Sequence, residues 1–352
     1  MDSIKNGSTP VITKESKKKI VVDYEGKLSA SERFKAKLKA SNTWIKMAVT
    51  ALRFILMLGV SFVIIYPFIA RIAGSFMTKE DVVDSTVSLI PKTPTLEIYK
   101  AIFVENHYLE ALTNTLILSL ACALIQMLVA CLVGYGLAKF KFKGNKIVMA
   151  LVVMTMVIPH GALQLSIIQH FTRFDIATVQ SWGYPGIVEL IVGKPLELTN
   201  TFAPNIILSV GGLAFKNGLY IYLLRQFFKG VPDELEESAY VDGSGTFRTF
   251  FQIILPLSIP MMITVFLFAF SWQWTDEFYT GLFFRSTFDK IYLMPDVYQV
   301  PESLNVTYAG TALYKNVVQN TGGLMIIAPL IVIYLFGQKY LVQGIERSGL
   351  VG

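Results

Sequence analysis

Six apolar runs, each close to the thickness of a bilayer in length, limit most strongly what this chain can fold into. A membrane-spanning helix needs about 20 mostly apolar residues. The runs cover residues 54–73, 115–138, 147–168, 206–227, 257–278 and 324–340. Only 16% of the 352 residues are charged, against about 25% in globular proteins. The sequence therefore predicts an all-α membrane protein with six transmembrane helices.

The distribution of Lys and Arg predicts which side of the membrane each loop faces. Twelve basic residues and five acids precede the first run. The short loop between the second and third runs has no acid and carries Lys139, Lys141, Lys143 and Lys146. The loop between the first and second runs instead has six acids and three lysines. Because basic loops stay in the cytoplasm, we expect both termini and the loop after the fourth run to be cytoplasmic.

Several kinds of site are excluded by composition and motif searches. Cys122 and Cys131 lie inside one apolar run, so we expect small apolar fillers rather than a disulfide or metal pair. The three histidines are scattered, and the net charge of +6 follows from topology rather than from a nucleic-acid partner. No Gly-x-x-x-x-Gly-Lys-Ser/Thr loop is present, so we do not expect this chain to hydrolyse ATP by that route.

A patterned polar segment separates the fourth and fifth runs. Pro232 suits the first turn of a helix, and the acids that follow it lie where the helix dipole favours anions: Asp233, Glu234, Glu236 and Glu237. Gly243 is placed where a left-handed residue ends a helix. A second short amphipathic run, residues 246–254, leads into Pro256. The pattern predicts a helix–glycine–helix element on the membrane surface, suited to contact with a partner.

The spacing within this segment also matches a known signature, with Ser238 in place of one alanine. The matching positions are Glu237, Ala239, Gly243, Ile253, Leu255 and Pro256. The segment resembles the "EAA" loop in permease subunits of bacterial binding-protein-dependent ABC importers. This resemblance covers roughly residues 55–352 and implies the type I ABC importer permease fold, with cytoplasmic coupling helices between spans four and five. It assigns Asp242 to the ATPase-coupling set as well.

The resemblance implies a set of partners and a cellular location. Two ATP-binding ATPase subunits would hold ATP and Mg, and this chain would bind no cofactor. A second homologous permease subunit, membrane lipid, and an extracellular lipid-anchored or periplasmic solute-binding protein would complete the system in the bacterial cell (inner) membrane. The loop would enter a cleft of the ATPase: Ala239 and Gly243 would allow close approach, and Val241, Phe247 and Phe250 would supply apolar anchors.

The C-terminal segment resembles that of maltose-transporter-type carbohydrate permeases. That likeness implies contacts of the tail with the ATPase interface, through Gln338, Gly344 and Gly352. Val351 stands where a lysine is usual, which leaves one polar contact open. The implied function is translocation of a carbohydrate, an oligosaccharide that is neutral or acidic. Residues 171–202 form an outer loop longer than the family pattern.

The expected organisation has four parts. Residues 1–45 form a basic, disordered cytoplasmic tail, with a short lipid-contacting helix at residues 30–40 as an alternative. Residues 46–112 hold the first span and an extracellular loop. Residues 113–342 form the permease core with five spans and the EAA loop at residues 229–256. Residues 343–352 form a cytoplasmic tail.

Two groups of residues are candidates for a substrate pathway. Near the end of the fifth run, Trp272 and Trp274 could stack on sugar rings, with Asp276 and Glu277 as hydroxyl partners; an interfacial aromatic belt is the alternative. Lys216 lies about midway along the fourth run, next to Asn217. A charge at mid-bilayer costs several kcal/mol unless it faces a cavity or a partner. A wet cavity, an acid of a neighbouring permease and an acidic sugar all stay open.

Two other classes of protein are alternatives. A self-contained secondary transporter or channel for a small polar solute would leave the patterned loop unexplained, and internal inverted repeats are not visible. An intramembrane enzyme would need a metal-ligand or nucleophile–base pattern, and the runs contain none.

Overall fold

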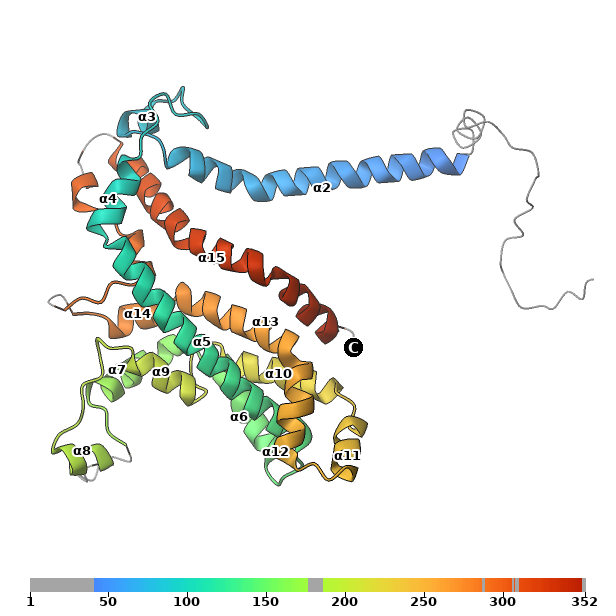
Figure 1. Cartoon of the computed structure of the whole chain (residues 1–352). Helices are drawn as coiled ribbons and strands as arrows, with labels where there is room; N and C mark the ends of the chain where they lie inside the picture. Colours follow the sequence, from blue (N-terminus) through green and yellow to red (C-terminus); the bar gives the residue numbers. More distant parts are fainter. Residues whose placement is uncertain (1–40, 177–185, 287–288, 306, 308–309, 350–352) are drawn as a thin grey trace, which may run out of the picture. The chain divides into compact units, whose positions relative to one another are not determined.

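The computed structural model describes residues 41–176, 186–286, 289–305, 307 and 310–349. In these ranges the structure is helical, and its one pair of β-bridged residues is Phe174 and Leu196 (Figure 1). The helices are α2 (Ser41–Gly74), α3 (Lys79–Val83), α4 (Glu97–Glu105), α5 (Tyr108–Lys139), α6 (Asn145–Val157), η1 (His160–Leu163), α7 (Gln164–Thr172), α8 (Ile187–Val192), α9 (Ala203–Val210), α10 (Asn217–Gly230), α11 (Glu234–Val241), α12 (Thr246–Thr249), η3 (Phe250–Ile254), α13 (Leu255–Trp274), α14 (Glu277–Phe283), η4 (Met294–Tyr298), η5 (Glu302–Leu304) and α15 (Thr311–Gly349).

The chain forms two compact units, residues 1–66 and 67–352. Within the first, the described residues belong to α2, which is long and apolar enough to cross a membrane. The remaining helices belong to the second unit. The tail expected over residues 1–45 lies outside the described residues up to residue 40, as does the alternative helix at residues 30–40.

The six apolar runs are not six continuous helices. Four stretches of the described chain have the length and composition of a membrane span: Trp44–Gly74, Tyr108–Lys139, Thr246–Trp274 and Thr311–Val342. The third run, expected as one helix, is a pair of helices bent by 93° between Val157 and His160. Pro159 explains the bend, because it lacks an N–H and moves the residue before it out of the helical conformation.

The fourth run is also broken, into α9 and α10. Two residues of the connecting segment have left-handed backbones, Gly212 with φ +71° and Lys216 with φ +67°. Lys216 is the N-cap of α10 rather than a residue midway along a span. Hydropathy alone did not reveal this, because Leu213, Ala214 and Phe215 keep the break inside an apolar run.

The last two runs have different ends from those expected. Helix α13 stops at Trp274, since the carboxylate of Asp276 accepts hydrogen bonds from the amides of Phe278 and Tyr279 and so starts α14. The expected span at residues 324–340 lies inside the longer α15. The segment expected as a separate tail continues that helix as far as Gly349.

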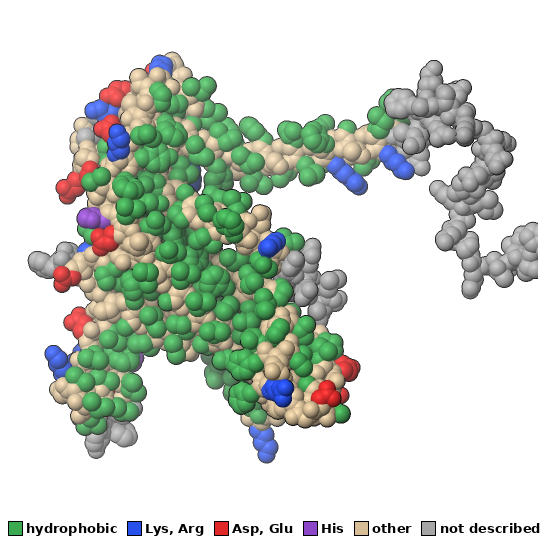
Figure 2. Space-filling view, in the orientation of Figure 1, with side chains coloured by type: hydrophobic (Ala, Val, Ile, Leu, Met, Phe, Trp, Pro, Cys, Tyr) green, Lys and Arg blue, Asp and Glu red, His purple; other side chains and the backbone are tan. Residues whose placement is uncertain are grey.

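Helix α5 is the centre of the second unit. It packs against α9, α10 and α13, and α13 in turn packs against α15. Glycines allow these close contacts: a Cβ on Gly134 would lie 3.0 Å from the backbone nitrogen of Arg225, and one on Gly337 would lie 2.7 Å from Leu267. In Figure 2, apolar side chains cover the face over α5, α13 and α15, whereas acids gather over α3, α4 and α11.

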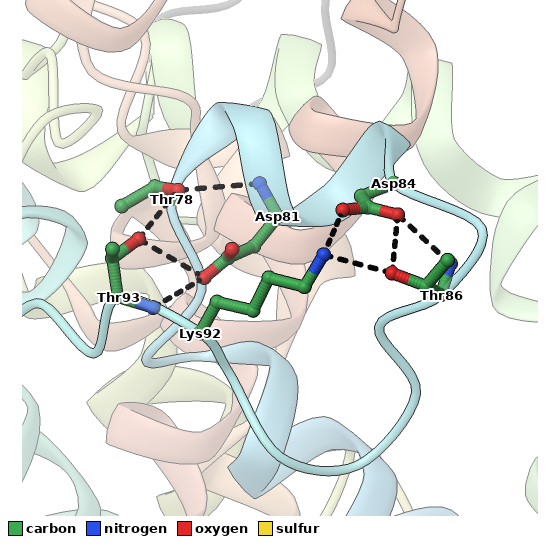
Figure 3. A network of polar contacts seen from close by, with 6 residues as sticks. All are labelled: Thr78, Asp81, Asp84, Thr86, Lys92 and Thr93. Atoms are coloured by element: carbon green, nitrogen blue, oxygen red, sulfur yellow. Dashed lines mark hydrogen bonds and ion pairs between the residues drawn. The ribbon is translucent and has the colours of Figure 1, made fainter.

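The segment between α2 and α4 is ordered by its own polar side chains, drawn in Figure 3. The ammonium of Lys92 binds the carboxylate of Asp84 and the hydroxyl of Thr86. Asp84 also accepts the Thr86 amide at 2.9 Å. These hydrogen bonds, the one from Lys92 first, hold the pKa of Asp84 well below its ordinary value. A second acid, the buried Asp81, accepts the amide of Thr93 at 3.1 Å.

Candidate functional site

The polar loop after the fourth run has the helix–glycine–helix form that its sequence predicts. Helix α11 ends at Val241, and Gly243 follows in the left-handed conformation with φ +79°. The Gly243 amide donates to the Tyr240 carbonyl at 3.0 Å, and the next amide donates to the Ala239 carbonyl at 2.9 Å. This paired bonding closes a helix at a left-handed residue. A Cβ on Gly243 would meet no atom within 4 Å, so the backbone angle, not crowding, favours glycine.

After the glycine the chain runs as helix from Thr246 to Trp274 with one π-helical turn, η3. Pro256 lies just beyond that turn, exposed, in the first turn of α13. It has no N–H for the carbonyl four residues earlier, and its ring crowds that carbonyl, which accounts for the wider turn before it. Ile253 and Leu255 are half-buried against the core. The loop is thus continuous with α13.

The two most exposed large apolar side chains of the loop are those of Val241 and Phe247. Val241 is 87% exposed and Phe247 is 82% exposed. The motif residues around them are exposed as well: Glu237, Ser238, Asp242 and Gly243. An apolar pair standing out from a polar turn is a common mark of a protein contact. This surface, made by Glu237, Ser238, Val241, Asp242, Gly243 and Phe247, is called the docking face below.

Two expected roles in this loop need correction. Phe250 is 4% exposed and its ring lies 4.6 Å from that of Tyr135, so it belongs to the core rather than to the docking face. Ala239 is 7% exposed and turned inward. The small side chain of Ala239 therefore allows α11 to pack closely against the rest of this protein. Both errors have one cause: an apolar residue in a short helix does not reveal which face it occupies.

Helix α11 is attached to the end of α5 by a buried hydrogen bond. The hydroxyl of Tyr135 donates to Oε1 of Glu236 at 2.8 Å, and both residues are buried. The two residues are 101 positions apart. Sequence reasoning identified Glu236 only as one of several first-turn acids. Its signal was weak, because nothing in the sequence separates a buried acid from its exposed neighbours.

Lys139 provides a second attachment. Its ammonium donates to the carboxylate of Asp233 at 2.6 Å and to the carbonyl of Val231 at 2.7 Å. The Lys139 side chain is only 6% exposed. The hydrogen bond from Lys139 lowers the pKa of the Asp233 carboxyl from its ordinary value. The sequence placed Lys139 among the topology-setting lysines; the structure adds that it joins α5 to the start of α11.

The aromatic candidates at the end of α13 divide into two environments. Trp274 is fully buried, and its indole N–H donates to the Ile326 carbonyl at 3.0 Å. It therefore packs between helices, and the stacking role expected for it is not supported. Trp272 is 48% exposed. Asp276 caps α14, and Glu277 is exposed.

The two remaining candidate groups lie elsewhere. Lys216 and the buried Asn217 start α10 at the break in the fourth run. Gln338 is exposed on α15 and bonds locally to the Leu335 carbonyl at 3.0 Å. Gly344 lies within α15, and Gly352 lies outside the described residues.

Residues 126–347, which include the docking face and both attachments, match the family model of the binding-protein-dependent transport system inner membrane component. The chain belongs to this family. It is thus a membrane component of a transport system, and its described chain has four helices long and apolar enough to cross a membrane.

Named relatives of this transport component cover most of its length. A galactooligosaccharide transport system permease of Bacillus subtilis (strain 168) is 26% identical over 85% of this chain and 94% of its own. A probable permease for starch degradation products from Thermoanaerobacterium thermosulfurigenes is 26% identical over 80% of this chain and 89% of its own. Among solved structures, a bacterial ABC transporter that imports the acidic polysaccharide alginate matches with TM-score 0.60 and 20% identity, over 83% of this chain and 96% of the other. That last likeness concerns the fold.

Proposed function

We propose that this chain is the membrane-spanning permease subunit of an ATP-driven importer, and that the docking face binds a separate ATPase subunit. The main observation behind this proposal is that Val241 and Phe247 are exposed on a loop that is itself attached to α5. Family membership supports it. So does the sequence, which lacks a phosphate-binding loop of its own. ATP and Mg²⁺ would be held by two such ATPase subunits.

The contacts around the docking face suggest how force would pass into the membrane. A push on α11 reaches α5 through the Tyr135–Glu236 and Lys139–Asp233 contacts. A push on α12 reaches α13 directly, because one helix connects them. Helices α5 and α13 pack together. Closure of the ATPase pair would therefore move both helices as one body and change access to the transport pathway.

The proposed topology has six crossings, with the docking face and both termini in the cytoplasm. The bent pair α6–α7 and the broken pair α9–α10 would each count as one crossing. Broken helices are tolerated at membrane depth where the irregular backbone is covered by protein or lines a wet cavity. The lysines at the end of α5 and in the loop that follows support the orientation, since Lys139 at the end of α5 binds Asp233, just before α11.

For the cargo, we propose an oligosaccharide delivered by a solute-binding protein. The relatives named above are permeases for galactooligosaccharides and starch degradation products. A second structural neighbour, with TM-score 0.55 and 17% identity, is an alginate transporter in complex with a pentasaccharide-bound periplasmic protein. A second homologous permease subunit would complete the pathway.

The proposal is tested by purifying the chain from its native membrane with its partners. We expect co-purifying ATPase subunits and vanadate-sensitive ATP hydrolysis. The substitutions Val241→Asp and Phe247→Asp, at residues that touch little of this chain, should abolish co-purification without reducing membrane insertion. Ile191→Asp is the matched control, because Ile191 is 78% exposed in α8, outside the docking face.

A substitution at Gly243 tests the same ATPase contact through the backbone geometry of the loop. Gly243→Ala places a side chain in a left-handed backbone, a cost of roughly 1–2 kcal/mol, and should weaken ATPase binding roughly 5- to 30-fold. Gly245→Ala is its control, since Gly245 has φ −77° and free space around it. Normal co-purification of both aspartate variants would refute the docking face. Proton-coupled uptake by the lone chain would refute the importer.

A further inference from the structure

A small pocket lies where α9 breaks and α10 begins. Its volume is about 130 Å³. The end of α6, the residue after Pro159 and the segment that leads into α10 line it, with Thr155, His160, Phe215, Lys216 and Asn217 among the lining residues. This pocket is separate from the docking face, and no step of the coupling proposed above uses it.

Asn217 lies at the wall of this pocket and does not open into it. The residue is fully buried, and among the described residues neither its side-chain oxygen nor its side-chain nitrogen has a partner. A Cβ on Gly212 would lie 3.6 Å from that nitrogen, so the amide is turned toward Gly212. The polar side chains that an occupant of the pocket would meet are therefore those of Thr155, His160 and Lys216.

The same pocket has a positive character. The ammonium of Lys216 lies 4.9 Å from the ring centroids of both Phe215 and Trp272. No Asp or Glu of the described chain lies within ion-pair distance of it. The ring of His160 lies 4.7 Å from that of Phe215. The first turn of the 14-residue α10 adds the positive end of its dipole.

The nearby acids do not cancel this charge. Asp276 uses its Oδ1 atom to accept two backbone amides of α14. Glu277 is exposed and forms no ion pair with Lys216. Lys216 also has a left-handed backbone, with φ +67°, a conformation that residues other than glycine rarely adopt. Such strain is concentrated at sites where position matters for function.

We propose that this pocket binds the carboxylate of an acidic sugar, a uronic acid residue of the transported saccharide. This inference rests on the proposed function. The pocket has room for a few waters but not for a sugar chain, so only a pendant group such as a carboxylate would enter. The sugar ring would lie outside, against the half-exposed face of Trp272, whose ring is 5.6 Å from Phe215. Lys216 would meet the carboxylate.

The test uses the whole importer complex in lipid nanodiscs, without its binding protein. Equilibrium binding is measured for a labelled uronate trisaccharide and for the neutral hexose trisaccharide with the same linkage. The wild type should bind the uronate at least tenfold more tightly. Lys216→Gln should lose roughly 10- to 150-fold in uronate affinity, the usual range for a hydrogen bond to a charged group. Binding of the neutral sugar should change little, and Lys216→Arg should restore most of the loss.

Lys339→Gln is the matched control, because Lys339 also lies 4.9 Å from an aromatic ring, that of Tyr340, but on α15. Equal affinity of Lys216→Gln and wild type for the uronate would overturn the inference. So would separation of the two permease subunits in Lys216→Gln, which would show that Lys216 pairs with a protein carboxylate. ATP-driven uptake of the neutral sugar by the variants would keep the proposed function intact in either case. Wild-type complex that takes up neither sugar would defeat the proposed function itself.

Discussion

The substitution Tyr135→Phe should free α11 from α5 while leaving the core packed. It removes one hydroxyl, which donates to Glu236 at 2.8 Å in a buried site. The ring that remains keeps its contacts, 4.6 Å from the Phe250 ring and 5.5 Å from the Phe228 ring. A hydrogen bond to a charged group contributes about 1.5–3 kcal/mol. At 1.4 kcal/mol per factor of ten, local opening of α11 should rise roughly 10- to 150-fold.

Hydrogen exchange of the α11 amides in nanodiscs measures this opening directly. Protection of α11 should fall by that factor in Tyr135→Phe, whereas α13 should be unaffected. In the reconstituted importer, saccharide carried per ATP hydrolysed should fall, because part of the ATPase motion no longer reaches α5. Tyr222→Phe is the control, since the Tyr222 hydroxyl accepts an exposed hydrogen bond from Gln226. A change below about threefold in α11 exchange would refute the idea that this bond anchors the loop.

Two further outcomes are expected. Gly218→Ala should lower the thermal midpoint of the purified chain, because the added Cβ would lie 2.4 Å from the Thr155 hydroxyl. Such overpacking costs about 1–3 kcal/mol. Gly281→Ala is the control: a Cβ on Gly281 would meet no atom within 4 Å, so the midpoint should be unchanged. The second outcome concerns the turn between α2 and α4 that holds Asp84. The lowered pKa of Asp84 stabilises this turn at every pH above the ordinary Asp value, about 3.9. This stabilisation is lost as the pH falls through the lower pKa of the folded state. Hydrogen exchange of that turn should therefore speed up only in strong acid, and Lys92→Met should move the change to higher pH; an unshifted profile would contradict the role given to Lys92.

Local rules predicted the parts of the loop at residues 229–256 that depend on neighbours in sequence. The start near Pro232, the left-handed stop at Gly243 and the second short helix all follow from backbone preferences of one or two residues. These features form wherever such residues stand together. Their positions in the structure agree with the sequence for that reason.

Hydropathy was less reliable for the spans. It located every apolar run, yet it could not show that two of them break, at Pro159 and between Val210 and Asn217. Proline gives a visible signal for the first break. At the second break Gly212 is left-handed, which its identity favours, but Lys216 is left-handed as well, and its identity gives no such signal.

By itself the sequence determined the membrane class, the family signature and the local shape of the loop at residues 229–256, because each depends on composition or on short spacing. The orientation expected from charge stays a prediction. Tertiary structure alone decided which apolar residues of that loop face outward, which acid binds Tyr135, and which polar groups meet at the pocket beside Lys216. Those outcomes join residues about 60 to 100 positions apart, such as Tyr135 with Glu236 and His160 with Phe215. Only the packing of α5, α6 and α10 brings such residues together.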